Sequence, residues 1–172
     1  YSGHVYIKPA DATGVLMDTM VVNTVGLVNM LELRLGLHYD ELSEQERVAH
    51  YYDAVFRYMN AHPVNVLAAS FRTSGLATAK AMLAWRDELR SAEWDFEGKD
   101  ISDRLVVLSG VEEYFRKLVG CDWAGRLHIV TDQVGFQKLD CKHLVIKMPV
   151  AKELLKPAIQ KLIDALEAQG AK

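Results

Sequence analysis

The chain has 172 residues, of which 50% are hydrophobic and 25% are charged. At ~100–200 residues per domain this length fits one domain, and the composition is that of an ordinary globular protein. A disordered tail, a collagen-like fibre and a bare coiled coil are therefore excluded. Since no apolar run approaches the ~18 residues that span a bilayer, we expect no membrane partner.

The charges are nearly balanced, with 20 Lys and Arg against 23 Asp and Glu. The resulting net charge of −3 argues against a dedicated nucleic-acid binder. Residues 126–161 nevertheless hold seven basic and three acidic side chains. A lysine-rich end of this kind can contact phosphates through its local field, and it can equally serve to keep the surface soluble.

Cysteine usage and the two ends of the chain suggest where the protein works. Cys121 and Cys141 are too few for a disulfide scaffold, so a cytoplasmic location is expected. The first residues lack the basic start and apolar core of a signal peptide. The chain begins without methionine and ends with Gly170 and two further residues after a helix-like segment, so we expect a piece of a longer protein.

The N-terminal part predicts strands and one helix. Residues 4–8 alternate enough to form a strand, and residues 11–14 have the composition of a turn. A more buried strand is expected over residues 18–22, followed by a helix over residues 27–35 that stops at Gly36. This strand–turn–helix order is the building unit of parallel α/β sheets.

The middle of the chain predicts helices. Residues 43–46 have the S-x-x-E spacing of a capping box, which starts an amphipathic helix that ends before Pro63. Apolar residues at helical spacing predict further helices over residues 74–90 and 103–118. The polar residues 95–100 between them are expected to form a loop.

The C-terminal part returns to strand-like patterns. Residues 126–131 and 143–148 predict strands, and Pro157 suits the first turn of a last helix. The sequence therefore predicts an α/β fold, a parallel-type sheet with flanking helices, and a helical insertion at about residues 40–119. We expect a single domain over residues 1–172.

The turn before the first predicted helix is a candidate nucleotide site. Asn23, Thr24 and Gly26 lie where α/β proteins hold phosphate, at a helix N-terminus that follows a strand. The chain has no G-x-x-x-x-G-K-[ST] motif, so no lysine is placed to reach the β- or γ-phosphates. The turn is thus expected to be structural, the remnant of a nucleotide loop, and no cofactor is expected.

A metal-dependent nuclease is the main alternative function. Asp140, Cys141 and Lys142 fit a D-x-K step, and Asp132 precedes it at a plausible distance for a second magnesium ligand. So short a pattern arises often by chance. The histidines and cysteines show no zinc-ligand spacing, and no catalytic set emerges from the sequence.

Trp85 and Arg86 on the predicted third helix allow two interpretations. Trp85 can anchor the core while Arg86 pairs with an acid one turn away. The two side chains can instead contact a neighbouring domain or a nucleic-acid strand. Further candidates for such a contact are Arg34, Lys142 and Lys147.

Three segments together resemble a known bacterial family. Residues 25–37 (VGLVNMLELRLGL) are similar to the family's "GPLGLLxLLExRLGL" opening, and residues 43–51 (SEQERVAHY) to its "SxxERVAxY" helix start. Residues 70–95, which include ATAKAMLAWRDEL, are similar to "SF…DPxATAxxLLxWRDEL…GWD". The family comprises PD-(D/E)XK nuclease proteins and inactivated superfamily I helicases, related to the B subunit of AddAB-type helicase–nucleases.

The resemblance implies a degenerate P-loop, helicase-like N-terminal region of a DNA repair protein. It would be a non-catalytic scaffold with a candidate DNA-contact surface, and nuclease chemistry would belong to a distant C-terminal domain. The implied partners are the remainder of a larger parent chain, DNA and a helicase subunit. A protein-interaction module without nucleic-acid binding is a further alternative.

Overall fold

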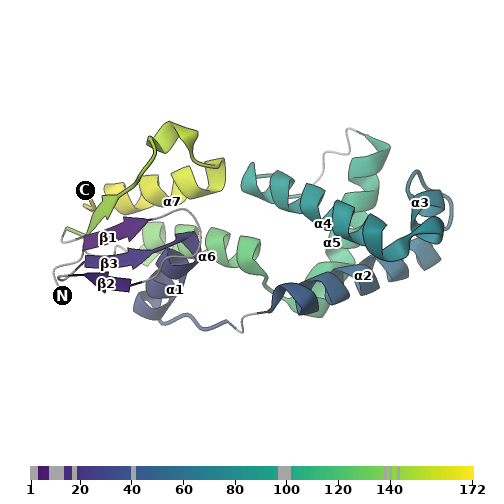
Figure 1. The fold of residues 1–172 in the computed structure, drawn as a ribbon, viewed down its shortest axis with the longest axis horizontal. Coiled ribbons are helices and arrows are strands. Elements are labelled where there is room, and N and C mark those ends of the chain that lie inside the picture. The colour runs from purple at the N-terminus through teal and green to yellow at the C-terminus, as the bar shows by residue number, and fades with distance from the viewer. Residues whose placement is uncertain are drawn as a thin grey trace. The chain divides into compact units, whose positions relative to one another are not determined.

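The computed structural model describes residues 4–7, 14–16, 19–39, 42–96, 102–137, 139, 141–142 and 144–172 (Figure 1). The chain divides into two compact units. Tyr1–Tyr39 and Gly125–Lys172 form one of them, which we call the sheet unit. Asp40–Ala124 forms the other, the helical unit. None of the described helices is long and apolar enough to cross a membrane.

The sheet unit contains four short strands in the order β2-β3-β1-β4. Their bounds are His4–Ile7 (β1), Gly14–Leu16 (β2), Thr19–Val22 (β3) and Val145–Lys147 (β4). β1 runs parallel to both β3 and β4, with His4 opposite Thr19 on one side and Val145 on the other. β2 is antiparallel to β3, so the sheet is mixed.

The sheet unit also contains helices. They are α1 (Thr24–Leu35), most of α6 (Trp123–Gln137), a short 3-10 turn (Lys152–Leu154) and α7 (Pro157–Ala168). Gly36 ends α1 in the left-handed conformation, at φ 67°, which glycine adopts without strain. In α7, Leu162, Ile163 and Leu166 are almost fully buried and supply an apolar face.

The α/β prediction is wrong, because the described residues are mostly helical. Seven α-helices stand against four strands of three or four residues each. The clearest error is residues 126–131, predicted as a strand but part of α6. Leu127, Val130 and Val134 are buried at helical spacing, a period that only a window longer than six residues reveals. The degenerate helicase-like description that accompanied the α/β prediction loses its support with it.

Other elements lie near their expected positions. β1, β3 and β4 fall within predicted strands, and α1 covers the predicted first helix. β2 was not predicted. Of the expected turn at residues 11–14 only Gly14 is described, and it belongs to β2. The expected loop at residues 95–100 is described only at its first two residues.

The helical unit packs four helices around one core. They are α2 (Glu44–Ala61), α3 (Ala68–Thr73), α4 (Gly75–Ser91) and α5 (Asp103–Val119). The helices predicted in this region are confirmed, and α3 is an additional short one. The capping box also forms: the Ser43 side chain accepts a hydrogen bond from the Glu46 amide, while the Glu46 carboxylate accepts one from the Ser43 amide at 2.9 Å.

The core of the helical unit is built on aromatic and aliphatic side chains. Tyr51 of α2 and Phe115 of α5 meet edge to face, with ring centroids 5.1 Å apart. Val55, Met82 and Val111 are fully buried around them. The prediction of a single domain with a helical insertion stays a prediction, because a compact unit within a chain can be either an insertion or a separate domain.

Gly110 is required where α5 crosses α2. A Cβ atom at this position would lie 2.1 Å from Cε2 of Tyr58, whose ring is buried. We expect Gly110→Ala to lower the free energy of unfolding by about 1–3 kcal/mol, because the packed core must shift. Urea unfolding followed by circular dichroism measures this.

Gly135→Ala in α6 is the matched control. A Cβ atom there would meet no atom within 4 Å. Alanine favours a helix over glycine by up to about 1 kcal/mol, so this variant should be unchanged or more stable. Equal effects of the two substitutions would contradict the close approach of α5 and α2.

Candidate functional site

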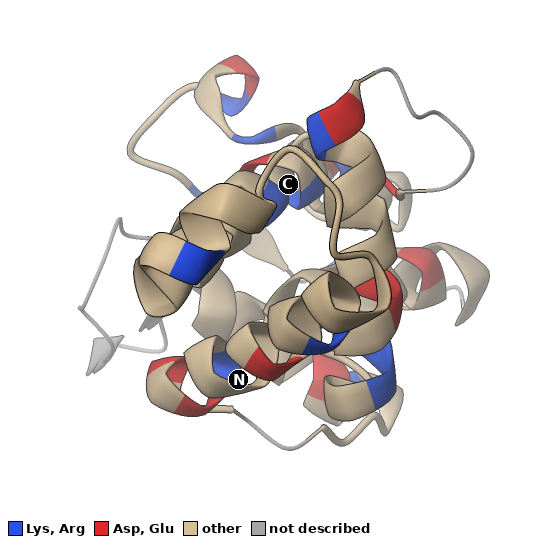
Figure 2. Ribbon diagram, turned by 90° about the vertical axis from the view of Figure 1, so that its right-hand side faces the viewer, with Lys and Arg blue, Asp and Glu red and all other residues tan. Residues whose placement is uncertain are grey.

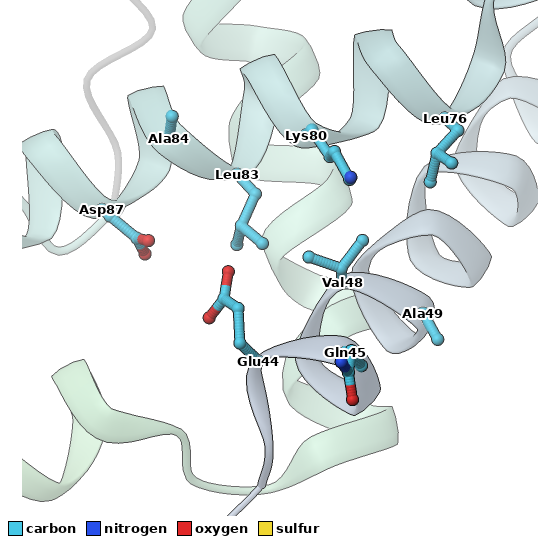
Figure 3. A pocket seen from close by; sticks show the side chains of 9 residues that line it. All are labelled: Glu44, Gln45, Val48, Ala49, Leu76, Lys80, Leu83, Ala84 and Asp87. Carbon is cyan, nitrogen blue, oxygen red and sulfur yellow. The ribbon is translucent and has the colours of Figure 1, made fainter.

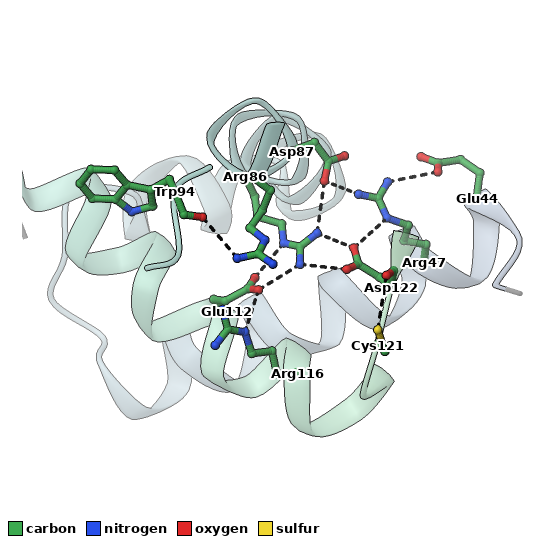
Figure 4. A network of polar contacts seen from close by, with 10 residues as sticks. Glu44, Arg47, Arg86, Asp87, Trp94, Glu112, Arg116, Cys121 and Asp122 are labelled. Carbon is green, nitrogen blue, oxygen red and sulfur yellow. Dashed lines mark hydrogen bonds and ion pairs between the residues drawn. The ribbon is translucent and has the colours of Figure 1, made fainter. Parts of the chain in front are cut away.

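Arg86 is the centre of a buried polar network in the helical unit (Figure 4). It lies in the second half of α4, and only 2% of its surface is exposed. Two carboxylates converge on its guanidinium group, Glu112 from α5 and Asp122 from the segment between α5 and α6. They are 2% and 7% exposed. A buried cation with buried anionic partners is thus the most unusual feature of this unit.

The contacts to Arg86 are bidentate. Its Nε donates to Oε2 of Glu112 at 2.7 Å and its Nη2 donates to Oε1 at 2.9 Å. Nη2 also donates to Oδ1 of Asp122 at 3.2 Å, and Nη1 donates to Oδ2. The guanidinium carbon lies 5.0 Å from the centre of the Phe115 ring. This planar fork is a geometry that arginine provides and lysine does not.

Further charges surround this centre. Arg47 of α2 donates to Asp87 of α4, and its Nε lies 3.6 Å from Oδ2 of Asp122. Arg116 donates to Glu112 at 3.1 Å from one turn further along α5. The network therefore ties together α2, α4, α5 and the segment that leads into α6.

Protonation in this region follows burial and the neighbouring charges. Burial acts to lower the pKa of Arg86, but its bonds to Glu112 and the charge of Asp122 outweigh burial and raise it. Arg90, one turn further along α4, has a lowered pKa because of burial and of repulsion by Arg86. Burial also raises the pKa of Tyr51. Both buried carboxylates of the network, those of Glu112 and Asp122, pair with Arg86. Their role is therefore structural.

A groove lies beside the network, between the first turns of α2 and the facing side of α4 (Figure 3). It has a volume of about 530 Å³. Its lining combines aliphatic and charged side chains, namely Glu44, Gln45, Val48, Ala49, Leu76, Lys80, Leu83, Ala84 and Asp87. The two carboxylates lie at the end away from Leu76, and both pair with Arg47. The groove can receive apolar groups.

The turn before α1 is closed by its own residues. The Asn23 side chain caps the helix by accepting a hydrogen bond from the Gly26 amide at 2.8 Å. A Cβ atom on Gly26 would lie 3.0 Å from Cβ of Val22, so glycine allows the close approach of α1 to β3. Thr24 is the first residue of the helix. One of the amides that would cradle a phosphate is thus already bonded, in line with a structural turn.

A second buried ion pair holds the sheet unit. Arg126 of α6 donates to both carboxylate oxygens of Glu32 in α1, at 2.8 and 2.6 Å, and to the Asn29 side chain at 2.6 Å. Arg126 and Glu32 are both buried. The sequence analysis missed this pair. Its only signal was a charged residue at the edge of the apolar face of each helix.

The predicted contact residues have different surroundings. Arg34 is exposed in the last turn of α1, and Lys142 and Lys147 are exposed in the sheet unit. Trp85 is 40% exposed, with Arg104 over its ring at 5.6 Å from the centroid. Arg86 is buried, as described above. The structure thus brings Arg86 into a cluster, but with acids 26 and 36 residues away rather than one turn away.

The residues of the nuclease alternative are only partly described. Asp132 is exposed on α6, Lys142 is exposed near β4, and Asp140 lies outside the described residues. Among the residues that the structure describes, no three His, Cys, Asp or Glu side chains are grouped so that they could hold a metal ion.

Comparison of the chain with known protein families, with curated proteins and with solved structures finds no match. The class that the described residues define is a mostly helical protein with two compact units, each braced by a buried arginine–carboxylate cluster.

The Arg86 network generates a prediction on stability. Arg86→Met keeps the length of the side chain but leaves Glu112 and Asp122 buried without their cation. We expect the free energy of unfolding to fall by about 3–5 kcal/mol, because uncompensated buried charges are costly. Urea unfolding measures the change.

Arg57→Met supplies the control for this prediction. Arg57 is exposed and pairs with Asp53 one turn earlier in α2, at 3.0 Å. An exposed pair of this kind contributes under about 1 kcal/mol. If Arg86→Met cost no more than Arg57→Met, the network would not hold the unit together.

Proposed function

We propose that this chain is a non-catalytic scaffold within a larger bacterial DNA helicase–nuclease or repair protein. The observation that carries the scaffold role is the Arg86 network, in which charged side chains from four segments pair with one another inside the helical unit. Such an arrangement fixes the relative positions of helices. A rigid unit of this type can position other parts of a parent chain.

The parentage rests on the three motif segments. Many of their residues have structural roles in this chain: Leu27 and Leu31 are buried, Ser43 and Glu46 form the capping box, and Arg86 centres the network. Packing, capping and ion-pairing roles of this kind are those expected of a scaffold, and they do not depend on the α/β fold.

The partners and location are part of the same proposal. The remainder of a parent chain and a helicase subunit are the proposed partners. A cytoplasmic location is proposed because Cys121 and Cys141 are too few for a disulfide scaffold. On the helical unit, Lys and Arg are interspersed with Asp and Glu, which favours a protein partner for this unit over a nucleic acid (Figure 2).

ATP binding tests the hypothesis that the turn at Asn23 is the remnant of a nucleotide loop. We expect no saturable ATP binding below about 1 mM, with or without magnesium, because the Asn23 side chain holds the Gly26 amide and no lysine follows the turn. Isothermal titration calorimetry measures this, with an active P-loop protein as positive control. Micromolar ATP affinity would contradict a non-catalytic role.

Fluorescence anisotropy with a labelled DNA duplex separates a scaffold from a DNA-contact surface. For a scaffold alone we expect no binding at about 0.15 M salt, where surface charges are screened beyond ~8 Å. Binding that falls steeply with salt, and that the double variant Lys142→Glu and Lys147→Glu removes, would instead show that the sheet unit contacts phosphates. The double variant Arg72→Glu and Lys80→Glu, at two exposed residues of the helical unit, is the matched charge control.

A further inference from the structure

Lys172 is bonded to the outer edge of β4. Its amide donates to the carbonyl of Leu144 at 3.0 Å, and its carbonyl accepts from the amide of Ile146 at 2.7 Å. These two bonds flank Val145. In a parallel pair of strands, a residue hydrogen-bonds to the two neighbours of the residue that lies opposite it. Lys172 is therefore paired with Val145 as a residue of a parallel strand would be.

The preceding residues hold Lys172 in this place. The Cys141 amide donates to the carbonyl of Gln169 at 3.2 Å, and Ala171 is buried. Gly170 turns the chain out of α7 at φ 99°, and a Cβ atom there would lie 3.0 Å from Cγ of Lys142. The turn thus requires glycine.

The connection has the form that parallel strands need. β4 is followed by α7, and the chain then returns beside β4 in the same direction. Parallel neighbours require such a crossover, which is usually helical. β4 is already parallel to β1 on its other side, where Val145 lies opposite His4.

The pairing can continue beyond this first residue. In a strand, the groups of alternate residues point to the same edge, so the Ile146 carbonyl and the Met148 amide follow on the edge that Lys172 occupies. Among the described residues the Met148 amide has no backbone partner. Pro149 has no amide hydrogen, but its backbone groups belong with those that point to the opposite edge of the strand. The edge beside Lys172 therefore offers at least one further residue pair.

We propose that the outer edge of β4 accepts a further parallel strand, and that its occupant is the polypeptide that continues from Lys172 in the larger protein. This inference rests on the proposed function, which places the chain within such a protein. The hydrogen bonds fix the direction and register of the added strand. Its second residue after Lys172 lies opposite Lys147, donates to the Ile146 carbonyl and accepts from the Met148 amide.

Hydrogen exchange of the Met148 amide tests the proposal. The chain is compared with one extended by Thr-Val-Thr-Val-Thr after Lys172, and exchange is followed by NMR. We expect the extension to slow exchange of this amide by about tenfold or more, since an exposed amide becomes part of a ladder. The Ile146 amide, which is already bonded, reports that the existing pair is intact.

A second extension carries proline at its second position as the matched control. It lacks the one amide that would donate to the Ile146 carbonyl, and it should give clearly weaker protection of Met148. Equal exchange of the Met148 amide in the unextended and both extended chains would overturn the proposal. Equal protection by both extensions would overturn the register.

The source of the strand is tested by adding the five-residue peptide to the unextended chain. A covalently linked segment has an effective concentration in the millimolar range or above, so the free peptide should protect Met148 much less at about 1 mM. Equal protection would overturn the assignment to a continuing chain and indicate a separate partner. ATP and DNA binding report on the proposed function independently of this exchange experiment.

Discussion

The fork of Arg86 between Glu112 and Asp122 is the constraint on which the helical unit depends. Three charges are buried here, and each is stable only while the others are in place. A guanidinium group that bonds to both carboxylates fixes the rotation of α4 against α5 and the position of the segment that leads into α6. Tyr51 and Phe115 belong to the hydrophobic core of this unit. Hydrophobic contacts are non-directional, whereas a bidentate ion pair also fixes the orientation of its partners.

The sheet unit uses the same device at a smaller scale. Arg126 reaches Glu32 and Asn29 on α1 and so fixes α6 across that helix. In both units an arginine crosses to carboxylates far away in the sequence. Burying such a pair costs desolvation, so its net contribution to stability is small, whereas removal of one partner leaves an uncompensated buried charge and is costly.

The proposed function and the edge of β4 both concern how this chain is joined to other parts of a larger protein. A scaffold acts through the surfaces by which it is joined to other parts, and the pairing of Lys172 with Val145 gives one such surface a direction and a register. The groove between α2 and α4 is a candidate surface on the helical unit, and Arg47 pairs with the carboxylates at its acidic end. Neither feature involves the turn at Asn23, whose side chain serves as a helix cap.

Elements with local sequence signals could be predicted correctly. The capping box at Ser43, the stop at Gly36 and the helical spacing in α2, α4 and α5 lie in adjacent residues, so these helices could be predicted. Contacts between distant residues required the tertiary structure. The segment at residues 126–131 lies in α6, where Arg126 pairs with Glu32 of α1 and where Leu127 and Val130 are buried. Arg86 pairs with carboxylates 26 and 36 residues away. No residue spacing in the sequence predicts this ion pair, because it forms only when separate helices pack together.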